Sequence, residues 1–230
     1  MLIIFSALTC AQGVTVTADV ALVNGGKKSK PRSANNVVLW LTPSGSMPPS
    51  VPGTQASKLP RLIQRNKSFD PHVLVVPVGS VVEFPNQDPF FHNVFSLFEG
   101  KRFDLGLYEA GSTRDVVFDK PGISYIFCNI HSEMSAVVIA VSSPYYGISD
   151  QRGRVAIPNV PAGRYTLRIW YEETLPEALN NLTREVTISE EASSLGAMRL
   201  PAMNTPPGHQ NMYGHDYPPP LPDSPTYERH

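Results

Sequence analysis

A series of short apolar runs separated by turn residues constrains the fold of this chain more than any other feature. Most runs are rich in Val and Ile, and Gly, Pro, Asn or Asp stand between them. This pattern is typical of β-sandwiches and barrels rather than of alternating strands and helices. We therefore predict an all-β fold with one short helix near residues 175–182. The predicted strands are 14–23, 35–41, 72–78, 80–84, 115–119, 123–128, 136–141, 154–157, 164–170 and 184–188.

The composition is that of a globular chain without a strong charge preference. The 230 residues suffice for one large or two small domains, and 41% hydrophobic residues suffice for packed cores. The formal net charge is −1, so the overall charge favours neither nucleic acid nor an anionic membrane as a partner. We expect no nucleic-acid partner.

The first residues resemble an export signal. Residues 2–8 form a short apolar region, and the small-residue stretch that follows suits a cleavage site. We predict a signal peptide over residues 1–12 and a periplasmic or otherwise exported protein. The alternatives are an N-terminal strand and a lipid anchor at Cys10. No later stretch has the roughly 18 apolar residues that a membrane span needs, so we expect no transmembrane segment.

The cysteine content raises a question about Cys128. The chain has two cysteines, Cys10 and Cys128, and removal of the signal would leave Cys128 without an intramolecular disulfide partner. Exported compartments oxidise thiols, so a single thiol there needs an explanation. It is either a metal ligand or a deeply buried, inert side chain.

The stretch FCNIHSEM, residues 127–134, places three donor side chains at equal spacing. Cys128, His131 and Met134 are each three residues apart, in a turn short enough to curl around one ion. A copper ion that alternates between two oxidation states favours two imidazoles, one thiolate and a weaker axial Met. His92, at a distant strand edge in FPNQDPFFHNVFS, supplies the second imidazole. We expect Asn86 to hydrogen bond across to the 128–134 loop and hold it in place.

Each donor taken alone has a simpler explanation. A single His in a loop is usually a surface residue, a single Cys after an apolar strand is usually buried core, and a Met after a turn is usually core as well. The combination favours a metal site, because two of the three histidines before the Pro-rich tail fall where a copper site needs them.

These segments resemble the cupredoxins, the type 1 or blue copper proteins. The resemblance covers residues 61–142 and is strongest to exported methylamine-utilisation and plastocyanin-like proteins, on the pieces FPNQD, HNVFS, FDLGLYEAG, FDKPG and CNIHSEM. It implies a Greek-key β-sandwich that binds one type 1-like copper ion through His92, Cys128, His131 and Met134. Many related loops have Pro or Gly before the second His, whereas this chain has Ile130, which leaves the colour class of the site open.

The segments on either side of this region resemble a transthyretin-like, carboxypeptidase regulatory-like module. The likeness is carried by residues 145–173, with a turn and two strands, and by residues 16–41. We predict that residues 14–45 and 143–200 form one discontinuous β-sandwich into which, or beside which, the cupredoxin domain of residues 61–142 is placed. Residues 46–60 are predicted to be a Pro/Gly/Ser-rich linker and residues 201–230 a disordered Pro-rich tail.

The leading functional hypothesis is one-electron transfer between unidentified redox protein partners in the cell envelope. We expect no enzyme activity and no small-molecule substrate, since the chain has no paired His-x-His motif of the kind that multicopper oxidases use. Two alternatives stay open. The protein is an envelope copper carrier or sensor, or it is a structural β-sandwich protein whose copper site is vestigial.

Overall fold

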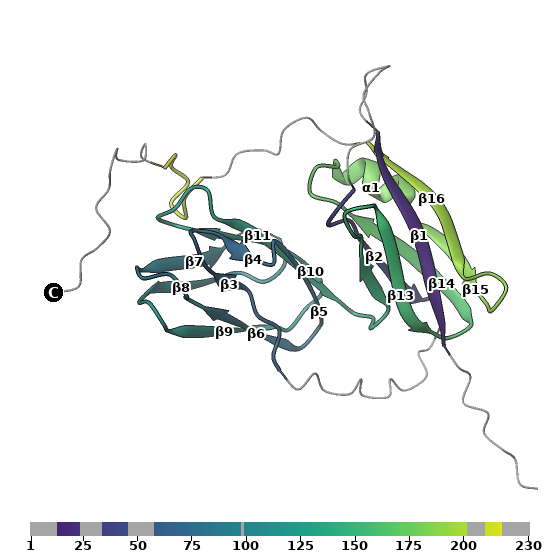
Figure 1. Cartoon of the computed structure of the whole chain (residues 1–230), viewed down its shortest axis with the longest axis horizontal. Helices are drawn as coiled ribbons and strands as arrows, with labels where there is room; N and C mark the ends of the chain where they lie inside the picture. The colour runs from purple at the N-terminus through teal and green to yellow at the C-terminus, as the bar shows by residue number, and fades with distance from the viewer. Residues whose placement is uncertain (1–12, 24–33, 46–57, 98, 202–209, 218–230) are drawn as a thin grey trace, which may run out of the picture. The chain divides into compact units, whose positions relative to one another are not determined.

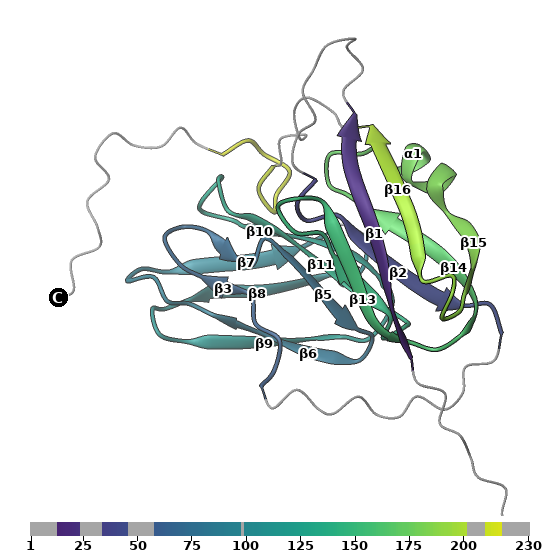
Figure 2. The same cartoon turned by 45° about the vertical axis from the view of Figure 1, so that its right-hand side comes forward.

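The computed structural model describes residues 13–23, 34–45, 58–97, 99–201 and 210–217. Apart from one short helix, the regular elements of these residues are β-strands, so the predicted all-β class is confirmed (Figures 1 and 2). The chain divides into two compact units. We call the one that reaches Pro49 and resumes over Tyr145–Pro206 the flanking unit, and the one that contains Ser50–Pro144 and the C-terminal segment the central unit.

The flanking unit contains two sheets. In the first, the order is β13-β1-β16, and in the second it is β12-β2-β14-β15. The elements are β1 (Val14–Val23), β2 (Val38–Pro43), β12 (Tyr146–Ile148), β13 (Arg154–Val160), β14 (Gly163–Trp170), α1 (Pro176–Leu182), β15 (Arg184–Ile188) and β16 (Ser194–Pro201). The helix lies where it was predicted.

Strand β1 shows why these residues form a sheet with one buried face. Its burial alternates along nearly the whole strand, with Val16, Ala18, Val20 and Leu22 buried and their neighbours at the surface. Alternation with a period of two is the signature of a strand that packs one face on a core. β1 pairs antiparallel with β13 and parallel with β16, so a strand from before the central unit pairs with two strands that follow Tyr145.

The central unit is a β-sandwich. A five-stranded sheet has the order β5-β11-β10-β7-β8, and smaller sheets pair β6 with β9 and β3 with β4. The strands are β3 (Ile63–Gln64), β4 (Phe69–Asp70), β5 (Val73–Pro77), β6 (Ser80–Pro85), β7 (His92–Ser96), β8 (Phe103–Tyr108), β9 (Thr113–Phe118), β10 (Gly122–Cys128) and β11 (Ser135–Val141).

One hydrophobic core joins the sheets of the central unit. Phe84 on β6 and Phe118 on β9 belong to the same buried cluster as Val94 on β7, Ile126 on β10 and Val138 on β11. Because each sheet contributes apolar side chains to the shared interior, the layers hold one another in place. Cys128 and Met134 belong to this cluster too, so two of the predicted ligands sit at the edge of the core.

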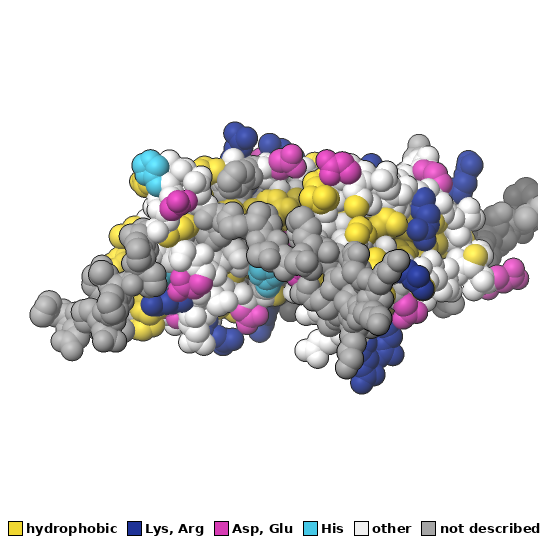
Figure 3. All heavy atoms as spheres, turned by 90° about the horizontal axis from the view of Figure 1, so that it is seen from above, with side chains coloured by type: hydrophobic (Ala, Val, Ile, Leu, Met, Phe, Trp, Pro, Cys, Tyr) yellow, Lys and Arg dark blue, Asp and Glu magenta, His cyan; other side chains and the backbone are white. Residues whose placement is uncertain are grey.

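Every predicted strand overlaps an observed one, but several observed strands were not predicted. Strand β7, which carries His92, was not among the predicted strands, and neither were β3, β4, β8, β12 and β16. The predicted signal peptide lies outside the described residues, as do residues 46–57 of the predicted linker. None of the described helices is long and apolar enough to cross a membrane. On the face shown in Figure 3, acidic and basic side chains are interspersed.

Of the tail predicted over residues 201–230, the structure describes Pro201 and residues 210–217, and the rest lies outside the described residues. Pro201 ends β16, and residues 210–217 form a defined turn. In this turn the Asn211 N–H donates to the His215 carbonyl at 2.9 Å, and the Gly214 N–H donates to the Asn211 carbonyl at 3.0 Å. Composition alone missed these bonds because the segment has few aliphatic residues to signal burial.

Gly153 allows a close approach between β1 and the turn before β13, which yields a stability prediction. It has a φ of +77°, and a Cβ there would lie 2.1 Å from the Val20 carbonyl oxygen. Gly196 has a similar φ of +74° with nothing near its Cβ position. Gly153→Ala should therefore cost about 1–3 kcal/mol more than Gly196→Ala, which pays only the backbone strain.

Urea unfolding followed by tryptophan fluorescence measures this difference. The only tryptophans of the chain, Trp40 and Trp170, lie on β2 and β14 of the flanking unit, so their signal reports on that unit. Equal losses of stability in the two variants would contradict the steric argument.

Candidate metal centre

His92 is placed by a strand that is buried along its whole length. It is the first residue of β7, and its side chain has no exposed surface. β7 runs antiparallel to β10, with Val94 opposite Cys128. The pairing therefore brings the beginning of β7 to the end of β10, where the loop with the other donors starts.

The loop between β10 and β11 is a tight turn closed by backbone hydrogen bonds. The Cys128 N–H donates to the Met134 carbonyl at 3.2 Å, and the Met134 N–H donates to the His131 carbonyl at 3.1 Å. These bonds curl residues 128–134 so that β11 returns antiparallel to β10. Cys128 and Met134 have no exposed surface, whereas His131 is half-buried.

Two imidazole nitrogens face one sulfur at separations that suit a shared ion. The Cys128 Sγ lies 3.7 Å from His92 Nδ1 and 3.5 Å from His131 Nδ1. The three donor atoms all lie within 4.8 Å of one another. A sulfur and a nitrogen that bind one ion, at the bond lengths typical of zinc, lie about 3.5–3.8 Å apart for tetrahedral to trigonal angles. The donor set therefore fits a metal ion that prefers soft sulfur and imidazole.

The orientation of His92 is set by Asp88, a residue that the sequence did not single out for this role. His92 Nε2 lies 2.9 Å from Asp88 Oδ2. With Nε2–H donated to this carboxylate, the lone pair of Nδ1 is directed at Cys128. Asp88 is itself fixed, because it accepts the backbone N–H groups of Asn66 at 2.6 Å and Lys67 at 3.0 Å. Carboxylate partners of this kind commonly orient metal-binding imidazoles.

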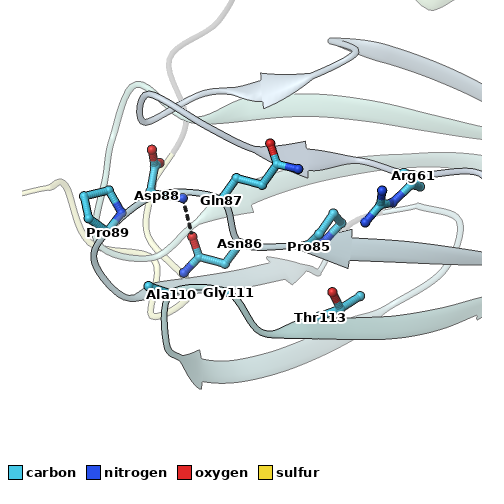
Figure 4. Close-up of a pocket in the computed structure, with 9 residues that line it drawn as sticks. All are labelled: Arg61, Pro85, Asn86, Gln87, Asp88, Pro89, Ala110, Gly111 and Thr113. Atoms are coloured by element: carbon cyan, nitrogen blue, oxygen red, sulfur yellow. Dashed lines mark hydrogen bonds between the residues drawn. The ribbon is translucent and has the colours of Figure 1, made fainter.

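Asn86 supports the His92 side of the site. Its amide donates to the carbonyls of Phe90 at 2.8 Å and Tyr108 at 3.4 Å. Figure 4 shows the third bond, in which its Oδ1 accepts the Asp88 N–H at 3.0 Å. Among the hydrogen bonds of the described residues, none of those made by Asn86 reaches the 128–134 loop. The bond across to that loop comes from Asn93, whose carbonyl accepts the Asn129 N–H at 2.9 Å.

The electrostatics favour neutral imidazoles and, without a metal, a protonated thiol. Burial lowers the pKa of His92 below its ordinary value although Asp88 acts to raise it. Burial, together with the nearby His92, lowers the pKa of His131 as well. Burial raises the pKa of the Cys128 thiol, against the N–H groups of Ile130, Asn93 and His131, which favour the thiolate. A metal that binds here would displace one proton, from the sulfur.

An aromatic ring covers the two imidazoles. The centroid of Phe90 lies 5.4 Å from that of His92 and 5.5 Å from that of His131, and the imidazoles are 4.9 Å apart in an edge-to-face arrangement. The Lys67 ammonium lies over Phe90 at 5.6 Å from its centroid. Phe90 thus limits the access of water to the nitrogen donors.

An open groove of about 560 Å³ runs beside the Asp88 turn (Figure 4). Its charged side chains already have partners. Arg61 pairs with Glu83 at 2.9 Å, and Asp88 holds His92. The lining residues are Arg61, Pro85, Asn86, Gln87, Asp88, Pro89, Ala110, Gly111 and Thr113.

Comparison with known proteins finds similarity to solved structures over part of the chain only. No family model matches the chain, and no curated protein matches it. Among solved structures, it is similar to a Cu-containing nitrite reductase from Thermus scotoductus, with 26% identity and a TM-score of 0.36 over 37% of this chain and 23% of that one. A purple cupredoxin from Nitrosopumilus maritimus is 23% identical, with a TM-score of 0.33 over 36% of this chain and 99% of the other.

A reduced mutant of amicyanin is 18% identical, with a TM-score of 0.35 over 37% of this chain and 85% of that one. TM-scores as low as these establish neither a shared fold nor a shared function. The case for a metal centre therefore rests on the side-chain geometry described above.

The Asp88–His92 pair gives a prediction for the metal-free protein. Asp88 is the group that raises the pKa of His92 against burial, so Asp88→Asn should lower the pKa of this imidazole further. An NMR titration of the histidine ring protons measures it, with Asp115→Asn, an exposed carboxylate on β9, as the control. A His92 pKa that stays the same or rises in Asp88→Asn would show that the carboxylate does not act on this ring.

Proposed function

We propose that the central unit is a cupredoxin-like domain that binds one copper ion and carries single electrons between redox proteins. The ligands would be His92 Nδ1, Cys128 Sγ and His131 Nδ1, with Met134 as a weaker fourth ligand. The observation that carries this proposal is the convergence of two imidazole nitrogens on one buried sulfur, at 3.5 and 3.7 Å. Two imidazoles and a thiolate with a distant thioether are the donor set that suits copper electron-transfer sites.

The protein supplies a donor set that is arranged in advance. Asp88 orients His92, and the closed turn of residues 128–134 positions the other donors. When bound, copper would supply a one-electron couple between its two common oxidation states. The N–H groups directed at the Cys128 sulfur favour the thiolate and would moderate its donation to a bound metal. A rigid donor set of this kind needs little rearrangement when the charge changes.

The arrangement supports electron transfer better than catalysis. With Met134 included, the protein would fill the coordination sphere and leave no position for a substrate. Among the imidazoles, His92 is fully buried and His131 is half-buried, so His131 is the edge that a redox partner would approach. We propose further that the protein is exported, on the strength of residues 1–12 of the sequence.

We also propose that the flanking unit is a transthyretin-like domain interrupted by the central unit. Support comes from strand pairing, because β1 and β2 pair with strands that follow Tyr145 in the chain. The flanking unit holds no His/Cys/Asp/Glu cluster of metal-binding geometry among its described residues. Its contribution to the proposed function would be structural.

Copper loading tests the proposed function directly. The purified chain with added Cu(II) should develop a visible thiolate-to-copper charge-transfer band, and Cys128→Ser should abolish it. Met134→Leu should keep the band and raise the reduction potential, because the weak thioether ligand would tune the couple. Visible absorption, EPR and a redox titration measure these outcomes. A wild-type protein that takes up copper without such a band would refute a type 1-like site, and rapid copper exchange would favour a carrier.

Copper affinity should rise with pH. The Cys128 thiol determines the direction of this dependence. Burial raises the pKa of Cys128, so its proton must leave when the metal binds, whereas the imidazoles are neutral already. Affinity should increase about tenfold per pH unit between about pH 7 and 8.5. Competition with a chelator of known pH dependence measures it. Cys128→Ser should show a nearly flat profile, and a flat wild-type profile would contradict the assignment.

A further inference from the structure

A short C-terminal segment contacts the metal loop through two hydrogen bonds. The Tyr217 hydroxyl donates to the Cys128 carbonyl at 2.8 Å, and the Met212 N–H donates to the Asn129 side-chain oxygen at 3.0 Å. Residues 210–217, drawn in yellow in Figures 1 and 2, belong to the central unit and lie beside the loop between β10 and β11. They are separated from β10 by more than eighty residues of sequence.

The segment has an internal structure that fixes its two contact points. Asn211 organises it, since its Oδ1 accepts the N–H groups of Tyr213 at 2.9 Å and His215 at 3.1 Å. Met212 and Tyr217 are half-buried, whereas Tyr213 is 71% exposed. Met212 and Tyr217, which contact the loop, are therefore less exposed than Tyr213, as expected for a segment that packs against the loop.

These contacts act on Cys128, which carries the thiol, and on its neighbour Asn129. On the sheet side, the Asn129 N–H is held by the Asn93 carbonyl at 2.9 Å. On the other side, Tyr217 and Met212 hold the Cys128 carbonyl and the Asn129 side chain. Cys128 and Asn129 are thus bonded to two elements that are remote from each other in the sequence, which restrains the start of the loop.

We propose that residues 210–217 form a strap that positions the Cys128 thiol for metal binding, with Tyr217 as its main anchor. This inference rests on the function proposed above, because it assigns these residues to the same site. Tyr217 acts as a positioning residue, since it binds a carbonyl of the loop rather than the metal. The strap keeps the loop closed, so its release would expose the thiol and, with a metal bound, would let the ion leave faster.

Thiol reactivity in the metal-free protein tests the strap without reference to copper. Cys10→Ser in the full chain leaves Cys128 as the only thiol. An aromatic disulfide reagent reaches this buried sulfur only when the loop opens. Tyr217→Phe removes one hydrogen bond and should increase the reaction rate about three- to tenfold. Tyr213→Phe, which removes an exposed hydroxyl from the same segment, should leave the rate unchanged.

Two further measurements test whether a faster thiol reaction comes from opening of the loop or from general loss of the fold. A chain that ends after residue 209 lacks the whole strap and should react at least as fast as Tyr217→Phe. Hydrogen exchange at the Asn129 and Ile130 amides should rise in both variants while exchange in β5 and β11 stays constant, which separates local opening from loss of the fold. Equal rates in the Cys10→Ser chain with and without Tyr217→Phe would overturn the strap.

The outcomes separate the strap from the copper proposal. If wild type shows no thiolate-to-copper band, the copper site fails and the thiol measurement still decides whether the strap closes the loop. If wild type shows the band, Tyr217→Phe should release copper to a chelator about three- to tenfold faster. If neither copper release nor thiol reactivity changes in Tyr217→Phe, the strap is refuted and the copper site still stands.

Discussion

The approach of two imidazoles to one buried sulfur is the interaction on which the candidate metal site of the central unit depends. Burial raises the pKa of Cys128 and lowers the pKa values of His92 and His131, so each donor is uncharged without a metal. Three uncharged donors can share a water-poor space without strong repulsion. The same burial makes a thiolate costly unless a cation neutralises it, and this is how the fold favours an ion with affinity for sulfur.

The two sides of the site are held by different means. On the β7 side, the carboxylate of Asp88 collects three N–H donors, and this lowers its pKa although burial opposes ionisation. On the loop side, backbone bonds of Cys128 and Met134 form the turn, and the C-terminal segment restrains it from outside the sheet. A fixed charge therefore orients one imidazole, while chain geometry places the sulfur.

Local patterns were predictable from the sequence, and remote contacts were not. Cys128, His131 and Met134 follow one another at intervals of three residues, which is short enough for a single turn to hold all three. Strand β7 was missed because its residues are all buried, so the alternation that marks a strand is absent. Asp88 and Tyr217 were not assigned roles, since the first gains its meaning from the fold around β7 and the second acts across eighty-nine residues.

The parallel pairing of β1 with β16 has a consequence for the order in which the protein takes shape during synthesis. β1 is made first among the described strands, but its partner over Ser194–Pro201 leaves the ribosome only after the whole central sandwich. The edge of β1 that pairs with β16 therefore stays unpaired until β16 has been made, while strands β3–β11 already have their partners. The Tyr217 contact with the Cys128 carbonyl forms later still, because Tyr217 follows β16 in the sequence.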